Sequence, residues 1–212
     1  MKRITGILCS AFLLVMVTVV SASAQALKDF FNDSAVPVTW LGVDFTQAKV
    51  LNEANGTPSG IKQQFTKINQ LIMSEPAKYT VDKAFDKPGM IKNIAFVTAK
   101  NEKIEPENIK EFSSDDVRFK KETITSIVKG YDFGDKKGMG VMFIAETLNK
   151  ASATGAFYVT ILDMGSRKVL LTERMTGKPV GFGFRNYWAK TIHDILLQIE
   201  RGRYSEWKSA NG

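Results

Sequence analysis

The residues best able to do chemistry form a glycine-rich stretch near the C-terminal end of the chain. Residues 177–186 read GKPVGFGFRN and join a predicted strand to a predicted helix. Such a junction can bind an anion, because the N–H groups of the first helical turn are exposed and point at it. The candidate residues for binding a phosphate or carboxylate are Lys178, Gly181, Gly183, Arg185 and Asn186.

This loop matches no established nucleotide-binding motif. Asn186 stands where the dinucleotide fingerprint needs its third glycine, and the Walker A pattern is absent as well. The strand before the loop is also predicted to belong to a hairpin, not to a strand–helix–strand unit. The sequence therefore favours the other interpretation, a tight loop that lets Phe182 and Phe184 reach the core.

Thiol, imidazole and metal chemistry are limited by composition. One Cys and one His among 212 residues cannot build a structural zinc site or an internal disulfide. His193 is predicted on the polar side of the last helix, near Lys190 and Asp194, and no G-x-S-x-G motif provides a serine nucleophile. We therefore predict no catalytic residue, no metal and no cofactor.

Paired carboxylates are the acid–base chemistry that the composition leaves open. Asp115 and Asp116 are predicted to begin a helix, and Glu146 lies late in a strand. Four further glutamates fall in a charged loop that is predicted to be solvated surface: Glu102, Glu105, Glu107 and Glu111. A glycosidase-type pair comes from distant positions, so a carboxylate-dependent hydrolase acting on an envelope polymer stays open as the alternative function.

The positive charge is mild and spread along the chain. The net charge is +7, from 29 Lys and Arg against 22 Asp and Glu. A nucleic-acid-binding protein would concentrate such charge in a patch, so no nucleic acid is predicted as a partner. Trp207, with Tyr204, lies in a polar C-terminal tail and is the candidate interface residue, because exposed Trp often anchors protein contacts. The alternative is that the tail folds back and Trp207 covers the edge of the sheet.

The first 24 residues are predicted to be a secretory signal peptide. Lys2 and Arg3 precede an apolar run of about 14 residues, and Ala22-Ser23-Ala24 matches a cleavage site. The run is shorter than the ~20 residues that span a bilayer as a helix, so no transmembrane segment is expected after cleavage. Removing 24 residues leaves 188, takes away Cys9, and lowers the net charge from +7 to +5. The predicted location is periplasmic or secreted.

Alternating strands and helices are predicted to position these residues in one domain, residues 25–212. Strand period marks residues 38–45, and apolar residues spaced as on one helical face mark 61–75. A short strand is predicted at 94–97 and a helix from Ser113 to about Gly130. Three strands follow, at 141–145, 156–162 and 169–172, with a hairpin turn at 163–168, and then a helix from Asn186 to Ile199. A helical lead-in is predicted at residues 26–32.

The predicted fold class is α/β (or α+β). We expect a single domain with a mixed β-sheet of about five strands covered by about three helices, in the order β-α-β-α-β-β-β-α.

Two stretches carry a resemblance. VTWLGVDFTQA (38–48) and the run from Gly177 to Ile199 resemble uncharacterised exported proteins of Bacteroides-type bacteria. The strand 157–163, the strand from 168 and the closing helix are similar to the periplasmic α/β domain of the curli-secretion channel family and to the TolB amino-terminal domain. The resemblance covers about a third of the chain and implies a non-enzymatic envelope module, with self-association left open. The lipoprotein Cys and the extra strands of the channel are missing from this chain.

These observations favour an exported binding or assembly module of the cell envelope without catalytic activity. Its expected contacts are a sheet edge, the Gly181–Asn186 loop or Trp207, and its expected partner is a protein or a second copy.

Overall fold

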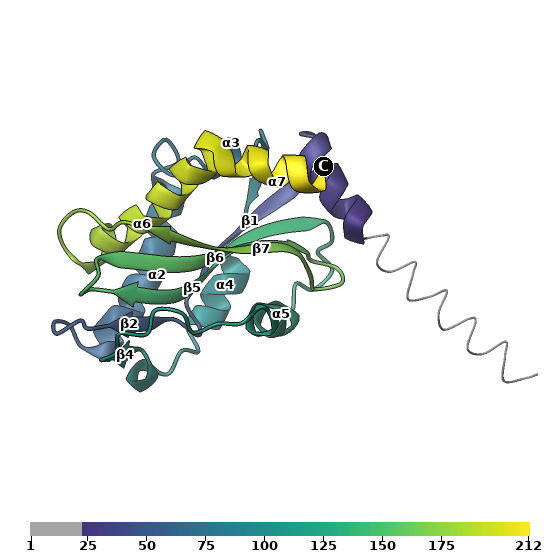
Figure 1. Ribbon diagram of the computed structural model, residues 1–212. Helices are drawn as coiled ribbons and strands as arrows, with labels where there is room; N and C mark the ends of the chain where they lie inside the picture. The colour runs from purple at the N-terminus through teal and green to yellow at the C-terminus, as the bar shows by residue number, and fades with distance from the viewer. Residues whose placement is uncertain (1–22) are drawn as a thin grey trace, which may run out of the picture.

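The computed structural model describes residues 23–212, shown as a coloured ribbon in Figure 1. Most of the predicted signal peptide, with Cys9, lies outside the described residues, so cleavage after Ala24 stays a prediction. The strands are β1 (Val38–Asp44), β2 (Lys49–Leu51), β3 (Ile91–Lys92), β4 (Lys110–Glu111), β5 (Met139–Asn149), β6 (Thr154–Asp163) and β7 (Lys168–Gly177). After a helical segment at residues 23–32, the helices are α2 (Pro58–Ser74), α3 (Val81–Ala84), α4 (Ala95–Asn101), η1 (Pro106–Asn108), α5 (Lys121–Lys129), α6 (Phe184–Gln198), η2 (Ile199–Arg203) and α7 (Tyr204–Asn211).

The seven strands form one mixed sheet around β5. β1 pairs in parallel with the first half of β5, and β2 pairs in parallel with its last three residues. β1 and β2 therefore follow each other along the same side of β5, interrupted at residues 45–48. β3 lies beside β1 and β4 beside β2, again in parallel, while β6 and β7 continue the sheet antiparallel on the other side of β5. The predicted α/β class, the mixed sheet and the 163–168 hairpin turn are confirmed.

Side-chain amides from two helices complete the hydrogen bonding at the end of β1. The Val43 N–H donates to Asn69 Oδ1 at 2.8 Å, and its carbonyl accepts from Asn69 Nδ2 at 2.9 Å and from Asn101 Nδ2 at 3.0 Å. The Phe45 N–H donates to Asn101 Oδ1 at 2.8 Å. These amides are needed because β3 pairs with only two residues of β1, and buried backbone groups without partners are costly.

Gly42 allows the helices to come this close. Its φ is +97°, a left-handed conformation that glycine adopts at no steric cost. A Cβ at this position would lie 2.8 Å from both Asn69 Oδ1 and Val97 Cγ2. The register with β5 shifts between Trp40 and Gly42, so the glycine sits in a bulge that turns the strand end toward both amides.

Helices cover both faces of the sheet. Helices α2, α6 and α7 and the 23–32 segment pack on one face, and α4 and α5 lie on the other, as Figure 1 shows. β5 alternates between the two cores, since Val141 and Phe143 belong to the first and Met142 and Ile144 to the second. All eleven residues of β5 are buried, as expected for a central strand covered on both sides.

The prediction of a strand at residues 94–97 is wrong, because helix α4 begins within this segment, at Ala95. A four-residue apolar run fits a buried helical turn as well as a strand, and periodicity does not separate the two. The short strands β2, β3 and β4 and the helices α3, η1, η2 and α7 were not predicted either. Each is eight residues or shorter, too short for a periodic pattern to develop.

The helix predicted from Ser113 begins only at Lys121. Residues 116–119 are held instead by the fully buried carboxylate of Glu146, whose Oε1 accepts the N–H groups of Arg118 and Phe119, both at 2.7 Å. Its Oε2 accepts from Arg174 Nε at 2.6 Å. These contacts keep the segment extended across the sheet, because two backbone donors that would enter a helical turn are bound to a strand.

Candidate functional site

The largest cavity that we find in the described part of the chain opens at the carboxyl ends of β2 and β5, between the N-termini of α2 and α6. It has a volume of about 600 Å³, and we call it the α2–α6 pocket. Ligands of open α/β sheets bind in crevices at this end of parallel strands. Its lining residues are Glu53, Asn55, Gly56, Thr57, Gly60, Ile61, Gln64, Lys150, Gly181, Phe182, Gly183, Phe184, Tyr187 and Trp188.

Aromatic side chains of α6 form one wall of this pocket. The ring of Trp188 contacts those of Tyr187 and Phe184, with centroids 5.0 and 6.2 Å away. Trp188 is only 1% exposed, and its indole N–H has no acceptor among the described residues. Buried Trp N–H groups usually have a partner. This N–H is itself buried, so what the wall offers a ligand is apolar surface.

The two helix N-termini at the pocket differ in capping. At the start of α2 the Thr57 hydroxyl accepts the Gly60 N–H at 3.1 Å, which satisfies one free donor of the first turn. The residue before α6 is Gly183, which has no side chain, and no side-chain cap is present there. The first-turn N–H groups of α6 are therefore available to an anion, and the helix dipole favours negative charge at this end.

One cation and one carboxylate line the pocket. Lys150, the residue after β5, places its Nζ 3.6 Å from the centroid of the Tyr187 ring. Glu53 is 7% exposed, and its Oε1 accepts the Asn55 N–H at 2.9 Å. The carboxylate is thus partly satisfied within its own turn, whereas the ammonium group and the uncapped helix face the cavity region. This arrangement suits an anionic group attached to an apolar body.

The predicted anion-binding residues divide into three groups. Gly181 and Gly183 line the α2–α6 pocket. Arg185 and Asn186 line an adjoining hollow of about 270 Å³. Lys178 lines neither, and its N–H donates to Asp194 Oδ2 at 2.9 Å. The helix predicted to begin at Asn186 starts two residues earlier, at Phe184, and Asn186 Oδ1 accepts from Arg185 Nε at 3.0 Å.

The interpretation that Phe182 reaches the core is wrong. Phe182 is 95% exposed, whereas Phe184 is half-buried and contacts Trp188. The loop turns outward at this point because Gly181 and Gly183 both have positive φ angles, +118° and +72°.

The candidate interface residues Trp207 and Tyr204 are not exposed. Trp207 is 5% exposed, donates from Nε1 to Glu173 Oε2 at 2.6 Å, and lies 6.4 Å from the ring of Phe85. Tyr204 is 8% exposed and contacts Phe31. The prediction that these two side chains are exposed, on which the interface role depended, is therefore wrong. The tail folds back so that Trp207 contacts the edge strand β7 through Glu173.

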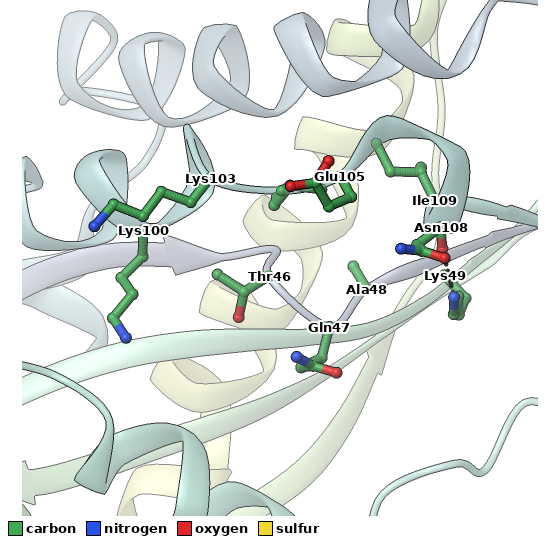
Figure 2. A pocket seen from close by; sticks show the side chains of 10 residues that line it. Thr46, Gln47, Ala48, Lys49, Lys100, Lys103, Glu105, Asn108 and Ile109 are labelled. Carbon is green, nitrogen blue, oxygen red and sulfur yellow. Dashed lines mark hydrogen bonds between the residues drawn. The ribbon is translucent and has the colours of Figure 1, made fainter.

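A second opening lies at the carboxyl end of β1, and we call it the β1–β2 cleft. It has a volume of about 460 Å³ and runs beside residues 45–48, where the paired strand is interrupted. Figure 2 shows Lys100 and Lys103 on one side and Lys49 on the other, with the Lys49 Nζ directed at the Asn108 carbonyl. Glu105 is the carboxylate that lines it.

A smaller hollow of about 350 Å³ shares Thr46, Gln47 and Lys100 with this cleft. Below it, the Tyr131 hydroxyl donates to Asp44 Oδ2 at 2.7 Å, and Asp44 Oδ1 accepts the Thr46 N–H at 2.6 Å. Burial, and then the Asp44 carboxylate, raises the pKa of Tyr131 far above its usual value. The hydroxyl therefore stays protonated and is committed to holding Asp44.

Asp115, Asp116 and His193 have structural partners. Asp115 Oδ1 accepts the Val117 N–H at 3.1 Å and Asp116 Oδ1 accepts from Asn149 Nδ2 at 2.7 Å, so neither caps a helix. His193 is half-buried, not solvent-facing as predicted. Its ring lies 6.1 Å from that of Tyr79, because this side of α6 meets the segment before α3.

Sequence reasoning missed Lys150, Tyr187 and Glu53. The available signal is positional, since Lys150 directly follows β5 and Glu53 lies two residues after β2, and the carboxyl ends of these strands meet at one edge. β2 has only three residues, so the sequence did not reveal that edge.

The chain matches no protein-family model, no curated protein and no solved structure. Within residues 23–212, no helix has both the length and the apolar character to cross a membrane. In that same range, no group of three or more His, Cys, Asp or Glu side chains is placed to hold a metal ion.

Proposed function

We propose that the protein is an exported binding module of the cell envelope, whose α2–α6 pocket holds an anionic ligand with an apolar body. One observation carries the proposal. The uncapped N-terminus of α6 and the Lys150 ammonium belong to one cavity that is walled by the rings of Phe184, Tyr187 and Trp188. Donors and positive charge beside apolar rings are the lining that a small amphipathic anion requires.

No observation favours the hydrolase. Such an enzyme needs two carboxylates from separate elements in one cleft. In the described residues, the α2–α6 pocket is lined by the single carboxylate of Glu53 and the β1–β2 cleft by that of Glu105.

Binding can be tested with 8-anilinonaphthalene-1-sulfonate, an apolar aromatic anion that fluoresces when water is excluded from it. The purified protein is expected to bind one molecule saturably, with its circular dichroism spectrum unchanged. Tyr187→Ala removes a ring of the wall and is expected to weaken binding about tenfold. Phe112→Ala is the matched control, because Phe112 is 77% exposed and does not line the pocket.

Equal affinities in the wild type and Tyr187→Ala would overturn the pocket assignment. So would an unsaturable fluorescence rise in the wild type, which indicates non-specific binding.

Export is tested separately. Mass spectrometry of the envelope-derived protein is expected to give Gln25 as the first residue. A cytoplasmic protein that begins at Met1 would contradict it.

A further inference from the structure

The loop before α6 carries the most exposed large apolar side chain among the described residues. Phe182 is 95% exposed and Val180, two residues earlier, is 64% exposed. We call residues 180–182 the apolar tip. The left-handed glycines at 181 and 183 would meet no atom within 4 Å if a Cβ were added, so the tip stands clear of neighbouring elements. The conformation of the chain therefore presents these two side chains to the surroundings.

Holding Phe182 and Val180 in water does not stabilise the protein. Burying a Phe or Val side chain makes a favourable contribution relative to leaving it in water. The neighbouring Phe184 obtains part of that contribution by contacting Phe65 and Trp188. Phe182 obtains almost none of it. An apolar group held outward by a defined backbone conformation indicates a surface that covers it in the working state of the protein.

The chain segment that carries the apolar tip has charge of one sign. Residues 175–193 contain no Asp or Glu, and they include Lys178, Arg185 and Lys190. Lys178 and Arg185, on either side of the tip in the chain, are exposed, and neither forms an ion pair with a described carboxylate. Of the carboxylates from other segments, Asp194 accepts only the backbone N–H of Lys178, and Glu53 lines the α2–α6 pocket. Exposed apolar side chains flanked in the chain by exposed cations match an anionic lipid surface, where headgroup charge overlies hydrocarbon.

We propose that the apolar tip inserts Phe182 and Val180 into the surface of an anionic phospholipid bilayer, with Lys178 and Arg185 at the level of the headgroups. The apolar side chains supply burial, and the two cations supply electrostatic attraction to an anionic surface. The association is peripheral and reversible, because only two side chains enter the bilayer. It adds a lipid surface to the pocket ligand of the proposed function and does not depend on that ligand.

Sedimentation with phospholipid vesicles tests the insertion. The purified wild-type protein is expected to bind vesicles that contain phosphatidylglycerol, and to bind pure phosphatidylcholine vesicles much less. Phe182→Ser is expected to reduce the partition coefficient at least about tenfold. Replacing both Lys178 and Arg185 by Gln is expected to give a similar loss, and added salt should weaken the wild type in the same direction.

The matched control is Phe112→Ser, which removes another exposed Phe from a different surface and is expected to leave the partition coefficient unchanged. An equal loss in Phe112→Ser, or equal binding of the wild type to both kinds of vesicle, would overturn the proposal. So would a lipid-free dimer that depends on Phe182 in light scattering, because the tip would then be covered by a second copy.

A further readout separates the tip from the pocket. Phe182 lines the α2–α6 pocket whereas Val180 does not, so Val180→Ser changes the tip alone. Loss of vesicle binding by Val180→Ser with the anilinonaphthalene sulfonate affinity retained supports insertion. Loss of both together would assign the effect to the pocket and overturn the proposal. If the Tyr187→Ala protein no longer binds the dye but still binds vesicles, the result would support insertion of the tip independently of the pocket ligand.

Discussion

The α2–α6 pocket and the β1–β2 cleft lie at the carboxyl ends of the successive strands β2 and β1 but have different walls. The pocket has a wall of packed rings, with Trp188 buried behind Phe184 and Tyr187. The cleft is lined by three lysines, and the Asp44–Tyr131 hydrogen bond lies beneath the hollow beside it. Helix α6 forms the pocket wall, whereas the cleft exists because the strand beside β5 is interrupted at residues 45–48.

The difference shows how a cation can be held in place for binding. Lys150 lies against the Tyr187 ring, so its ammonium is positioned before any ligand arrives. In the cleft, the Lys49 ammonium is bound to the Asn108 carbonyl and the Lys100 Nζ lies 5.3 Å from the centroid of the Tyr131 ring, whereas Lys103 is exposed. Ordering a free lysine costs side-chain entropy, so Lys103 should give less affinity than a positioned lysine beside an apolar wall.

The largest expected effect is at the pocket wall. Trp188→Ala should lower the free energy of unfolding by about 3–5 kcal/mol, because it removes a fully buried indole and leaves a cavity. Urea unfolding followed by circular dichroism measures it. Trp188→Phe keeps much of the volume and should lose less. A loss below about 1 kcal/mol for the alanine variant would show that the wall is not packed as described.

The next largest effect on stability is at the Asp44–Tyr131 hydrogen bond, which lies beneath the hollow beside the cleft. Asp44→Ala leaves the Tyr131 hydroxyl and the Thr46 N–H without their acceptor, so it should cost about 2 kcal/mol of unfolding free energy. Dye binding in the α2–α6 pocket should be retained. The control is Asp135→Ala, an exposed carboxylate whose removal should change stability by less than about 0.5 kcal/mol. Equal losses of unfolding free energy in the two variants would contradict a stabilising role for the buried Asp44 carboxylate.

A smaller effect is expected when one lysine of each cavity is substituted, which compares the two cations directly. Lys150→Gln should weaken binding of the dye several-fold, about 0.5–1 kcal/mol, because the ammonium beside Tyr187 is lost. Lys100→Gln makes the same change in the cleft and should leave the dye affinity as it is. Fluorescence titration of the two variants side by side measures both. A loss in Lys100→Gln as large as that in Lys150→Gln would contradict separate sites.

The smallest expected effect is on the pH dependence of stability, and it arises from His193 on α6. Burial, and then Lys190 and Lys78, lowers the pKa of His193 below its usual 6.5, against the opposing influence of Asp194. The unfolded chain therefore binds a proton more readily than the folded one. Stability should be fully present above pH 6.5 and decline as the pH falls toward the folded pKa. His193→Gln should flatten the melting temperature between pH 7 and 5, and an unchanged slope would contradict the assignment.

Long periodic elements of this fold could be predicted, whereas the short ones could not. The helix containing Ile61, Phe65 and Ile68 and the three late strands carry enough repeats to define a period. The edge of the sheet depends on β2, β3 and β4, of two or three residues each, which form only because β5 and β1 provide partners. Their existence is a tertiary effect that no local pattern encodes.

The candidate site shows the same division. The glycine-rich loop was found from its composition, and Gly181 and Gly183 do line the pocket. The outward direction of Phe182 was missed because the sequence does not reveal the positive φ angles on both sides of it. Burial of Trp207 was missed as well, since its partner Glu173 lies 34 positions away in the chain.

The two amide side chains that bind Val43 also bear on the order of folding. Asn69 and Asn101 are 26 and 58 positions from that residue, so the end of β1 gains its partners only after α2 and α4 have both docked. Pairing over such separations closes long loops and slows folding. It also couples the helices, because the Val43 carbonyl accepts from both amides and opening either helix breaks buried hydrogen bonds at the same residue. The Val43 and Phe45 amide hydrogens should therefore be among the slowest to exchange with solvent.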